Sequence, residues 1–227
     1  MQPKLSDTAE SSDAESGMVV ERRFTSSGKD PFDSFDWIEM DAEIRNPDGS
    51  MADTILGVKL PSGYAGVPGK VLAQKYLRKA GVPTHLRKVP EEGVPVWLQR
   101  SEPDTEKLDL LESDERFGGE TDGRELFRRL AGTWTYWGWK HGYFASEADA
   151  RSYFDEMCYI VASQRSAPNS PQWFNTGLHW AYGIEGPAQG HTYIDPVTGK
   201  LEYSTNAYEH PQPHACFIQS VGDSLVG

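Results

Sequence analysis

The chain has 227 residues, which is enough for one large domain or two small ones. Its formal net charge is −12, and because an acidic surface repels phosphates we expect no nucleic-acid-binding surface. It has only two cysteines, so we expect no disulfide scaffold. No apolar run reaches about 18 residues, so we expect no membrane span. Because there is also no secretory signal, we expect a cytoplasmic location.

The first part of the chain divides into a polar tail and a region with apolar patterning. Residues 1–22 are rich in Ser, Asp, Glu and Ala, which predicts a disordered acidic tail. Residues 23–100 are predicted to form an α+β region. Alternating apolar residues on both sides of the turn signal Asn46-Pro47-Asp48-Gly49 predict a small hairpin over residues 36–60.

Three segments have the apolar periodicity of helices. Residues 71–80 form a short amphipathic pattern that Gly81 ends, and residues 123–141 and 146–164 carry longer apolar stripes. Between the first two helices, acidic residues outnumber basic ones ten to three from Glu102 to Glu125. This charge run predicts a solvated acidic linker over residues 101–122.

After residue 165 the helical signal stops and glycines and prolines become frequent. Residues 193–201 are typical of a two-stranded excursion around a Pro/Gly turn. Residues 215–221 (ACFIQSV) predict a buried strand with a polar end. Taken without any resemblance, the chain is an acidic, mostly helical protein that ends in a strand.

Residue types alone leave the chemistry open. Cys216 lies in a short apolar run, where a cysteine is usually a small core residue, although a redox thiol is the alternative. Ser170 suits a turn cap, and it also suits a hydroxyl donor to a ligand. His191, His210 and His214 match no common zinc spacing together with Cys216, so we expect no metal site.

Three long segments resemble the vitamin B12-dependent (class II, adenosylcobalamin-dependent) ribonucleotide reductases. They are VLAQKYLRKAGVP at 71–83, RLAGTWTYWGWKHGYF at 129–144 leading into APNSPQWFNTGLHWAYGI at 167–184, and YEHPQPHACFIQSVGDSLV at 208–226. They occur in the family's order and spacing, and with their linking segments they cover residues 24–227. A class I reductase large subunit, which uses a radical-generating partner protein, resembles them less closely.

The resemblance implies a fold and a reaction. The fold would be mainly α with a small β-hairpin, with a helical domain over residues 123–213 and the first strand of a ten-stranded α/β barrel beginning within 214–227. In the family, adenosylcobalamin starts the formation of a thiyl radical on a barrel cysteine, and a ribonucleotide loses its 2'-hydroxyl as water. A pair of cysteines supplies the reducing equivalents and becomes a disulfide.

The resemblance also assigns roles to individual residues. Cys216, in the motif His-Ala-Cys-Phe, matches the first redox-active thiol of the reducing pair. Ser170 matches a substrate contact, and Ala215 and Cys216 are expected beside the same substrate. Trp173 and Trp180 are interpreted as packing residues, and Cys158 as a structural residue of the third helix.

The chain lacks other parts that the family uses. It has no Asn-Pro-Cys-Gly-Glu segment, no second cysteine of the reducing pair and no C-terminal cysteine pair. Adenosylcobalamin contacts are therefore expected mainly in segments that this chain does not contain. We expect an N-terminal fragment that is inactive alone, whether it comes from a truncated gene product, a split gene or an interrupted coding region.

The expected partners follow from the same resemblance. One is a ribonucleotide, expected as the diphosphate because the longer reductases that the chain resembles look like diphosphate reductases. The others are a thioredoxin-like or other dithiol reductant and a complementing chain that completes the barrel. The alternative is a non-catalytic relic that binds a nucleotide or a partner protein.

Overall fold

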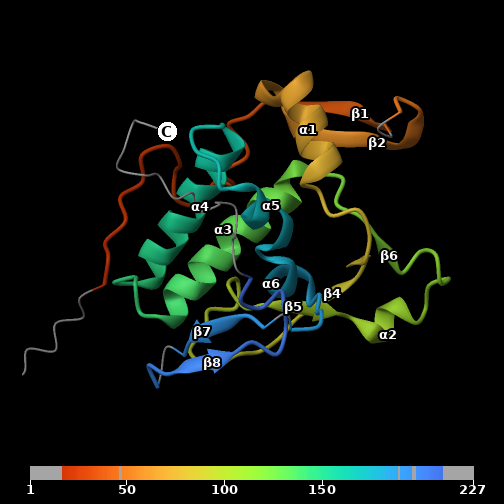
Figure 1. The fold of residues 1–227 in the computed structure, drawn as a ribbon. Coiled ribbons are helices and arrows are strands. Elements are labelled where there is room, and N and C mark those ends of the chain that lie inside the picture. Colours follow the sequence, from red (N-terminus) through yellow and green to blue (C-terminus); the bar gives the residue numbers. More distant parts are fainter. Residues whose placement is uncertain (1–16, 46–47, 189, 196–197, 212–227) are drawn as a thin grey trace, which may run out of the picture.

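A computed structural model describes residues 17–45, 48–188, 190–195 and 198–211 (Figure 1). The helices are α1 (Val67–Lys75), α2 (Thr105–Leu108), α3 (Gly123–Lys140), α4 (Glu147–Ala162), α5 (Ser170–Asn175), α6 (Leu178–Tyr182) and the 3-10 turn η1 (Ser62–Tyr64). The strands are β1 (Trp37–Arg45), β2 (Met51–Pro61), β3 (Val82–Pro83), β4 (Leu86–Lys88), β5 (Ser101–Pro103), β6 (Phe117–Gly118), β7 (Thr192–Ile194) and β8 (Leu201–Tyr203).

The expectation of a mainly helical chain is wrong, because the described residues form an α+β fold. Their strands pair as four antiparallel two-stranded sheets: β1 with β2, β3 with β6, β4 with β5, and β7 with β8. Most of these strands have only two or three residues, which is too short for an alternating apolar pattern to show in the sequence. The strand predicted at 215–221 as the start of a barrel lies outside the described residues.

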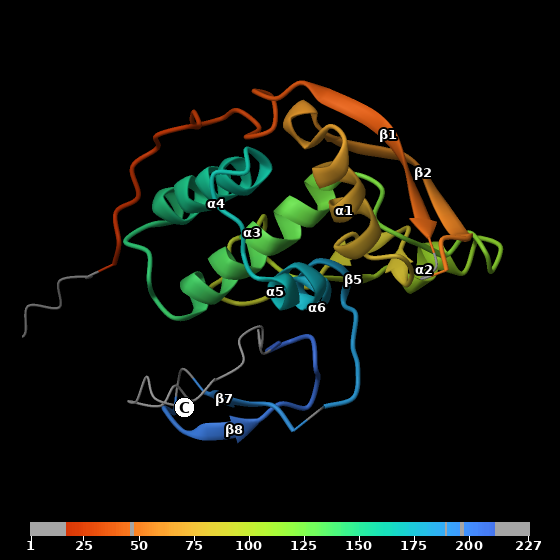
Figure 2. The same cartoon turned by 45° about the horizontal axis from the view of Figure 1, so that its top comes forward.

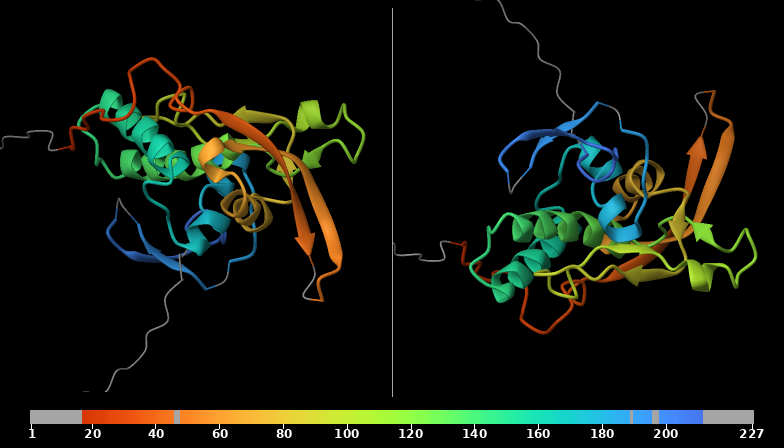
Figure 3. Two further views of the ribbon diagram at one scale, coloured as in Figure 1. Left: turned by 90° about the horizontal axis from the view of Figure 1, so that it is seen from above. Right: turned by 90° about the horizontal axis from the view of Figure 1, so that it is seen from below.

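The hairpin predicted over residues 36–60 is confirmed as β1 and β2, and it projects from one side of the molecule (Figure 3). Its register shifts between the pairs Met40↔Val58 and Ala42↔Ile55, which places an extra residue on β2. Gly57 adopts a φ of 65° at this bulge. A glycine is suited to that conformation because it has no Cβ.

The two long helices were predicted almost to the residue. α3 begins in a capping box, in which Asp122 accepts from the Arg124 backbone N–H at 2.9 Å and Glu125 accepts from the Asp122 N–H at 3.1 Å. The Ser146 side chain caps α4 by accepting from the Asp149 N–H at 3.2 Å. α3 lies in the middle of the fold, where it contacts β2, α5 and α6, and α4 lies along one side of it (Figure 2).

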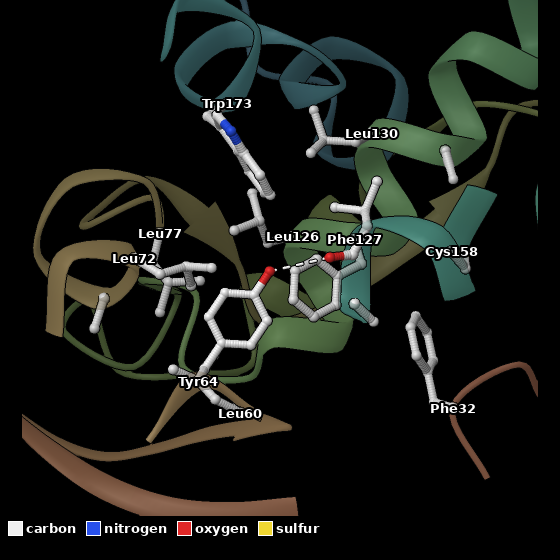
Figure 4. Close-up of a cluster of buried hydrophobic side chains, with 14 of the residues drawn as sticks. Phe32, Leu60, Tyr64, Leu72, Leu77, Leu126, Phe127, Leu130, Cys158 and Trp173 are labelled. Atoms are coloured by element: carbon white, nitrogen blue, oxygen red, sulfur yellow. Dashed lines mark hydrogen bonds between the residues drawn. The ribbon is translucent and has the colours of Figure 1, made fainter. Parts of the chain in front are cut away.

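The main core lies where α1, α3, α4 and the inner face of the hairpin meet (Figure 4). Leu60, Leu126, Phe127 and Leu130 are completely buried in it. The hydroxyl of Tyr64 donates to the Val161 carbonyl at 3.0 Å, which links the end of the hairpin to α4. Burial of these side chains is the main stabilising contribution to the fold.

The first helix differs from its prediction. It spans Val67–Lys75 instead of 71–80, because Pro68 fits the first turn of a helix and Tyr76 already serves as the C-cap. Gly81 does not end the helix directly but turns the chain, with a φ of 79°, into β3.

Part of the segment expected to be a tail is packed against the helices. Residues 1–16 lie outside the described residues, but Met18 forms a bridge to Phe144, and the Val20 N–H donates to Asp149 at 2.8 Å. Directly after the predicted tail, Glu156 accepts from the backbone N–H groups of Phe24 and Thr25 at 3.0 and 2.8 Å. Among the described residues there is no helix long and apolar enough to cross a membrane.

Candidate functional site

Ser170, the predicted substrate contact, is exposed at the first position of α5. The capping role belongs to its neighbour, since the Asn169 side chain accepts from the Gln172 N–H at 3.3 Å. The Ser170 hydroxyl is 3.1 Å from the hydroxyl of Tyr76. The hydroxyl is therefore not used as a cap, and it lies at the surface beside a second hydroxyl.

Tyr76 is held in place by its ring. It stacks on Trp173 with ring centres 5.5 Å apart and an angle of 26°, and it packs against Phe174 at 5.2 Å. Trp173 is 6% exposed and belongs to the main core, which agrees with its interpretation as a packing residue. The rings therefore fix the position of the Tyr76 hydroxyl relative to α5.

A buried arginine joins the two chain segments that carry these hydroxyls. The Arg129 guanidinium donates to the carbonyls of Trp173 at 2.9 Å, Thr176 at 2.6 Å and Tyr76 at 3.2 Å. Its side chain is completely inaccessible to solvent. These carbonyls have no helical partner at the ends of α5 and α1, so Arg129 satisfies them and fastens both ends to α3.

Glu120 balances the charge of Arg129. Its carboxylate accepts from Arg129 Nε at 2.7 Å, from the Tyr182 hydroxyl at 2.7 Å and from the Arg78 backbone N–H at 2.7 Å. Burial, together with the adjacent Glu120 charge, raises the pKa of Tyr182 well above its ordinary value, so this hydroxyl remains a donor. Glu120 belongs to the segment expected to be an acidic linker, but its side chain is completely buried.

Two glycines allow α6 to lie against α3. At Gly177, which has a φ of 88°, a Cβ would lie 2.3 Å from the Arg129 carbonyl oxygen. At Gly132 a Cβ would lie 2.2 Å from the Trp180 ring. The Trp180 indole N–H donates to the Leu98 carbonyl at 2.9 Å, so this tryptophan too is a packing residue. The close approach holds the chain after α5 directly on α3.

The structure thus brings together the first two segments that carry the family resemblance. Tyr76 comes from the first, Arg129 from the second, and Ser170 from its continuation. Ala215 and Cys216, predicted to lie beside the same substrate, are outside the described residues. Cys158 is completely buried in the core, and burial raises the pKa of its thiol well above the ordinary value, as a structural cysteine requires.

The sequence interpretation missed Tyr76, Glu120 and Arg129. One signal was available for Arg129, because it lies three residues after Leu126 and next to Leu130, inside the apolar stripe of α3. A charged residue in a buried stripe requires a buried partner of opposite charge. The sequence contains no signal that identifies Glu120, among ten nearby acidic residues, as that partner.

A separate cavity of about 1060 Å³ lies between the C-terminal half of α3 and the β7–β8 hairpin. Trp134, Trp137, Tyr193, His179 and His210 are among the residues that line it. Within the described part of the chain, no group of three or more His, Cys, Asp or Glu side chains is arranged to hold a metal ion. The residues around Ser170 do not line this cavity.

Comparison with known proteins identifies relatives for most of the chain. Residues 39–164 match the family model described as class II vitamin B12-dependent ribonucleotide reductase. Proteins named vitamin B12-dependent ribonucleotide reductase from Bradyrhizobium diazoefficiens and Agrobacterium fabrum are each 57% identical over 209 residues, which is 92% of this chain. One from Rhodopirellula baltica is 28% identical over 210 residues, also 92% of this chain. The chain spans 17%, 16% and 17% of the length of these relatives.

Proposed function

The chain belongs to the class II vitamin B12-dependent ribonucleotide reductase family, and from that premise we propose that it supplies substrate-side residues to such a reductase. The reaction would convert ribonucleotides, in diphosphate form, to deoxyribonucleotides for DNA synthesis and repair. The observation that carries this proposal is the exposed Ser170 hydroxyl on a helix that Arg129 fastens to the core, and the sequence resemblance implies that this serine contacts the substrate.

The proposed chemistry assigns one step to this chain. The 2'-hydroxyl of the ribose leaves as water and a hydrogen takes its place, while two thiols lose two electrons and become a disulfide. Cys216 would be the first of these thiols, and the second would come from a segment that this chain lacks. Ser170 would donate to a phosphate or ribose oxygen, and Ala215 would present its backbone to the same substrate.

The family depends on vitamin B12, and adenosylcobalamin supplies radical initiation in the proposed reaction. The corrin ring of this cofactor already holds its cobalt, so a cluster of side-chain ligands is not what its site requires, and the resemblance matches no residue of this chain to a cofactor contact. We therefore assign no residue of this chain to the cofactor. Its contacts, like the second thiol, are proposed to come from the rest of a complete reductase or from a complementing chain.

A chimeric enzyme tests the proposal directly. Residues of this chain replace the matching 209 residues of the Bradyrhizobium diazoefficiens reductase, with which they are 57% identical. The chimera is assayed with adenosylcobalamin, a dithiol reductant and either CDP or CTP, and deoxyribonucleotide is measured. We expect dCDP from the chimera and no product from the 227-residue chain alone.

The two cysteines of the chain provide a matched pair of variants. Cys216→Ser is expected to abolish product formation because it removes a redox thiol, while Cys158→Ser is expected to retain it because Cys158 is buried in the core. An inactive chimera that is folded and binds cobalamin contradicts the proposal and favours a non-catalytic nucleotide- or partner-binding relic. Equal activity of the two serine variants refutes the role of Cys216.

A further inference from the structure

The contact between Ser170 and Tyr76 joins residues that lie 94 positions apart in the sequence. Both hydroxyls lie at the surface end of α5, and no other hydrogen bond of either hydroxyl is present within the described residues. A serine hydroxyl rotates freely unless a neighbour fixes it. Tyr76 is thus the group that can set the direction of the Ser170 O–H bond.

The chemistry of the two hydroxyls decides the direction of the hydrogen bond when a ligand is present. A phenol is more acidic than an aliphatic alcohol, so Tyr76 is the better donor and Ser170 the better acceptor. Accepting from Tyr76 leaves the Ser170 proton free to donate outward. Successive hydrogen bonds of this kind polarise one another, so the outward O–H of Ser170 becomes a stronger donor to an anionic oxygen.

The backbone around the pair is built to keep this contact. Arg129 binds the carbonyl of Tyr76 itself and the carbonyl of Trp173, three residues after Ser170, with one guanidinium. The stacking of Tyr76 on Trp173 adds a second restraint between the same two segments. The two hydroxyls are therefore held next to each other before a ligand binds, so little conformational entropy is lost on binding.

We infer that Tyr76 is a positioning residue for Ser170: its hydroxyl donates to Ser170 Oγ and directs the serine proton toward an oxygen of the ribonucleotide. This inference rests on the proposed function for its ligand, but the coupling between the two hydroxyls is a property of the chain itself. The two parts are measured separately.

The first measurement is made on the 227-residue chain and needs no activity. Three-bond Hα–Hβ couplings of labelled serine report the χ1 rotamers of Ser170. We expect one rotamer in the unsubstituted chain and averaging over several in Tyr76→Phe, which removes only the hydroxyl. Tyr64→Phe is the matched control, because the Tyr64 hydroxyl binds Val161 in the core, and it is expected to leave the Ser170 couplings unchanged.

The second measurement is made on the chimeric reductase. We expect Tyr76→Phe to raise KM for the ribonucleotide roughly three- to tenfold and to change kcat by less than about twofold, because a ground-state hydrogen bond is weakened. Ser170→Ala is expected to raise KM at least as much, and the double variant is expected to match Ser170→Ala alone. Tyr64→Phe is expected to leave KM unchanged.

The outcomes separate the inference from the proposed function. Averaged Ser170 couplings in the unsubstituted chain, or unchanged couplings in Tyr76→Phe, overturn the positioning role whatever the chimera does. An unchanged KM, or effects of the two substitutions that multiply in full, overturn it as well. If the unsubstituted chimera is folded and binds cobalamin but makes no product, the proposed function fails, and the serine couplings alone decide whether Tyr76 positions Ser170.

Discussion

Arg129→Met is the substitution for which the structure predicts the largest effect. Methionine has a similar length and fills the space of the side chain, but it leaves Glu120 as a buried carboxylate without its cation. Removing one partner of a buried ion pair costs about 3–5 kcal/mol. The carbonyls of Tyr76, Trp173 and Thr176 lose their donor in the same step, so the upper end of this range is expected.

Such a loss is large for a protein of this size. Domains are typically stable by about 5–15 kcal/mol, so the variant should unfold at a much lower urea concentration. The assay is urea unfolding followed by far-ultraviolet circular dichroism and by tryptophan fluorescence. Coinciding transitions from the two probes are needed before a free energy is derived from the midpoint.

The neighbouring arginine is the control for this prediction. Arg128 pairs with Asp30 at 2.5 Å, but both side chains are more than 40% exposed, at 45% and 42%. Arg128→Met is therefore expected to cost less than about 1 kcal/mol, as exposed ion pairs do. A loss below about 1 kcal/mol for Arg129→Met, or equal losses for the two variants, refutes the assigned role of the buried pair.

Three further predictions concern packing and pH. Gly132→Ala is expected to lower stability by about 1–3 kcal/mol, because the new Cβ meets the Trp180 ring, and unchanged thermal unfolding contradicts this. The pKa of Tyr182 is raised from its ordinary value of 10.0, so the protonated hydroxyl contributes fully to stability below about pH 10, and this contribution is lost at higher pH. Tyr182→Phe should therefore make unfolding less sensitive to alkali. Burial raises the pKa of Glu156, but hydrogen bonds from Thr25 and Phe24 outweigh this and lower it below 4.5. The ionised Glu156 carboxylate therefore contributes to stability above about pH 4.5, and this contribution is lost as the pH falls through its lowered pKa. Glu156→Gln should remove part of the acid sensitivity in unfolding measured across that range.

Local patterns predicted the long elements well. The stripes of α3 and α4 and the turn signal of the hairpin are statements about neighbours in sequence, and these elements form where the patterns place them. The short strands were not predicted from the sequence because each has few residues and pairs with a distant segment. β3 and β6, for example, join Val82 to Gly118. No local pattern contains that information.

The acidic segment shows how composition misleads when one residue differs from its neighbours. Charge counting treats all ten acidic residues between Glu102 and Glu125 alike and predicts a solvated linker. The segment instead contains β5, α2 and β6, and Glu120 within it is only 2% exposed. A carboxylate is tolerated there only because Arg129 and Tyr182 already face it, which is a property of the fold and not of the composition.

The family resemblance predicts Ser170 as a substrate contact, but the residues that hold it in place lie in other segments of the chain. Ser170 is exposed, and its hydroxyl contacts that of Tyr76, which belongs to a distant segment of the chain. Its position depends on α5, the position of α5 depends on carbonyl contacts with Arg129, and Arg129 is stable in the core only with Glu120 beside it. A substitution at Glu120 should therefore weaken any function of Ser170 without approaching the ligand. Glu120→Gln, which keeps the shape and removes the charge, separates this indirect effect from a loss of packing.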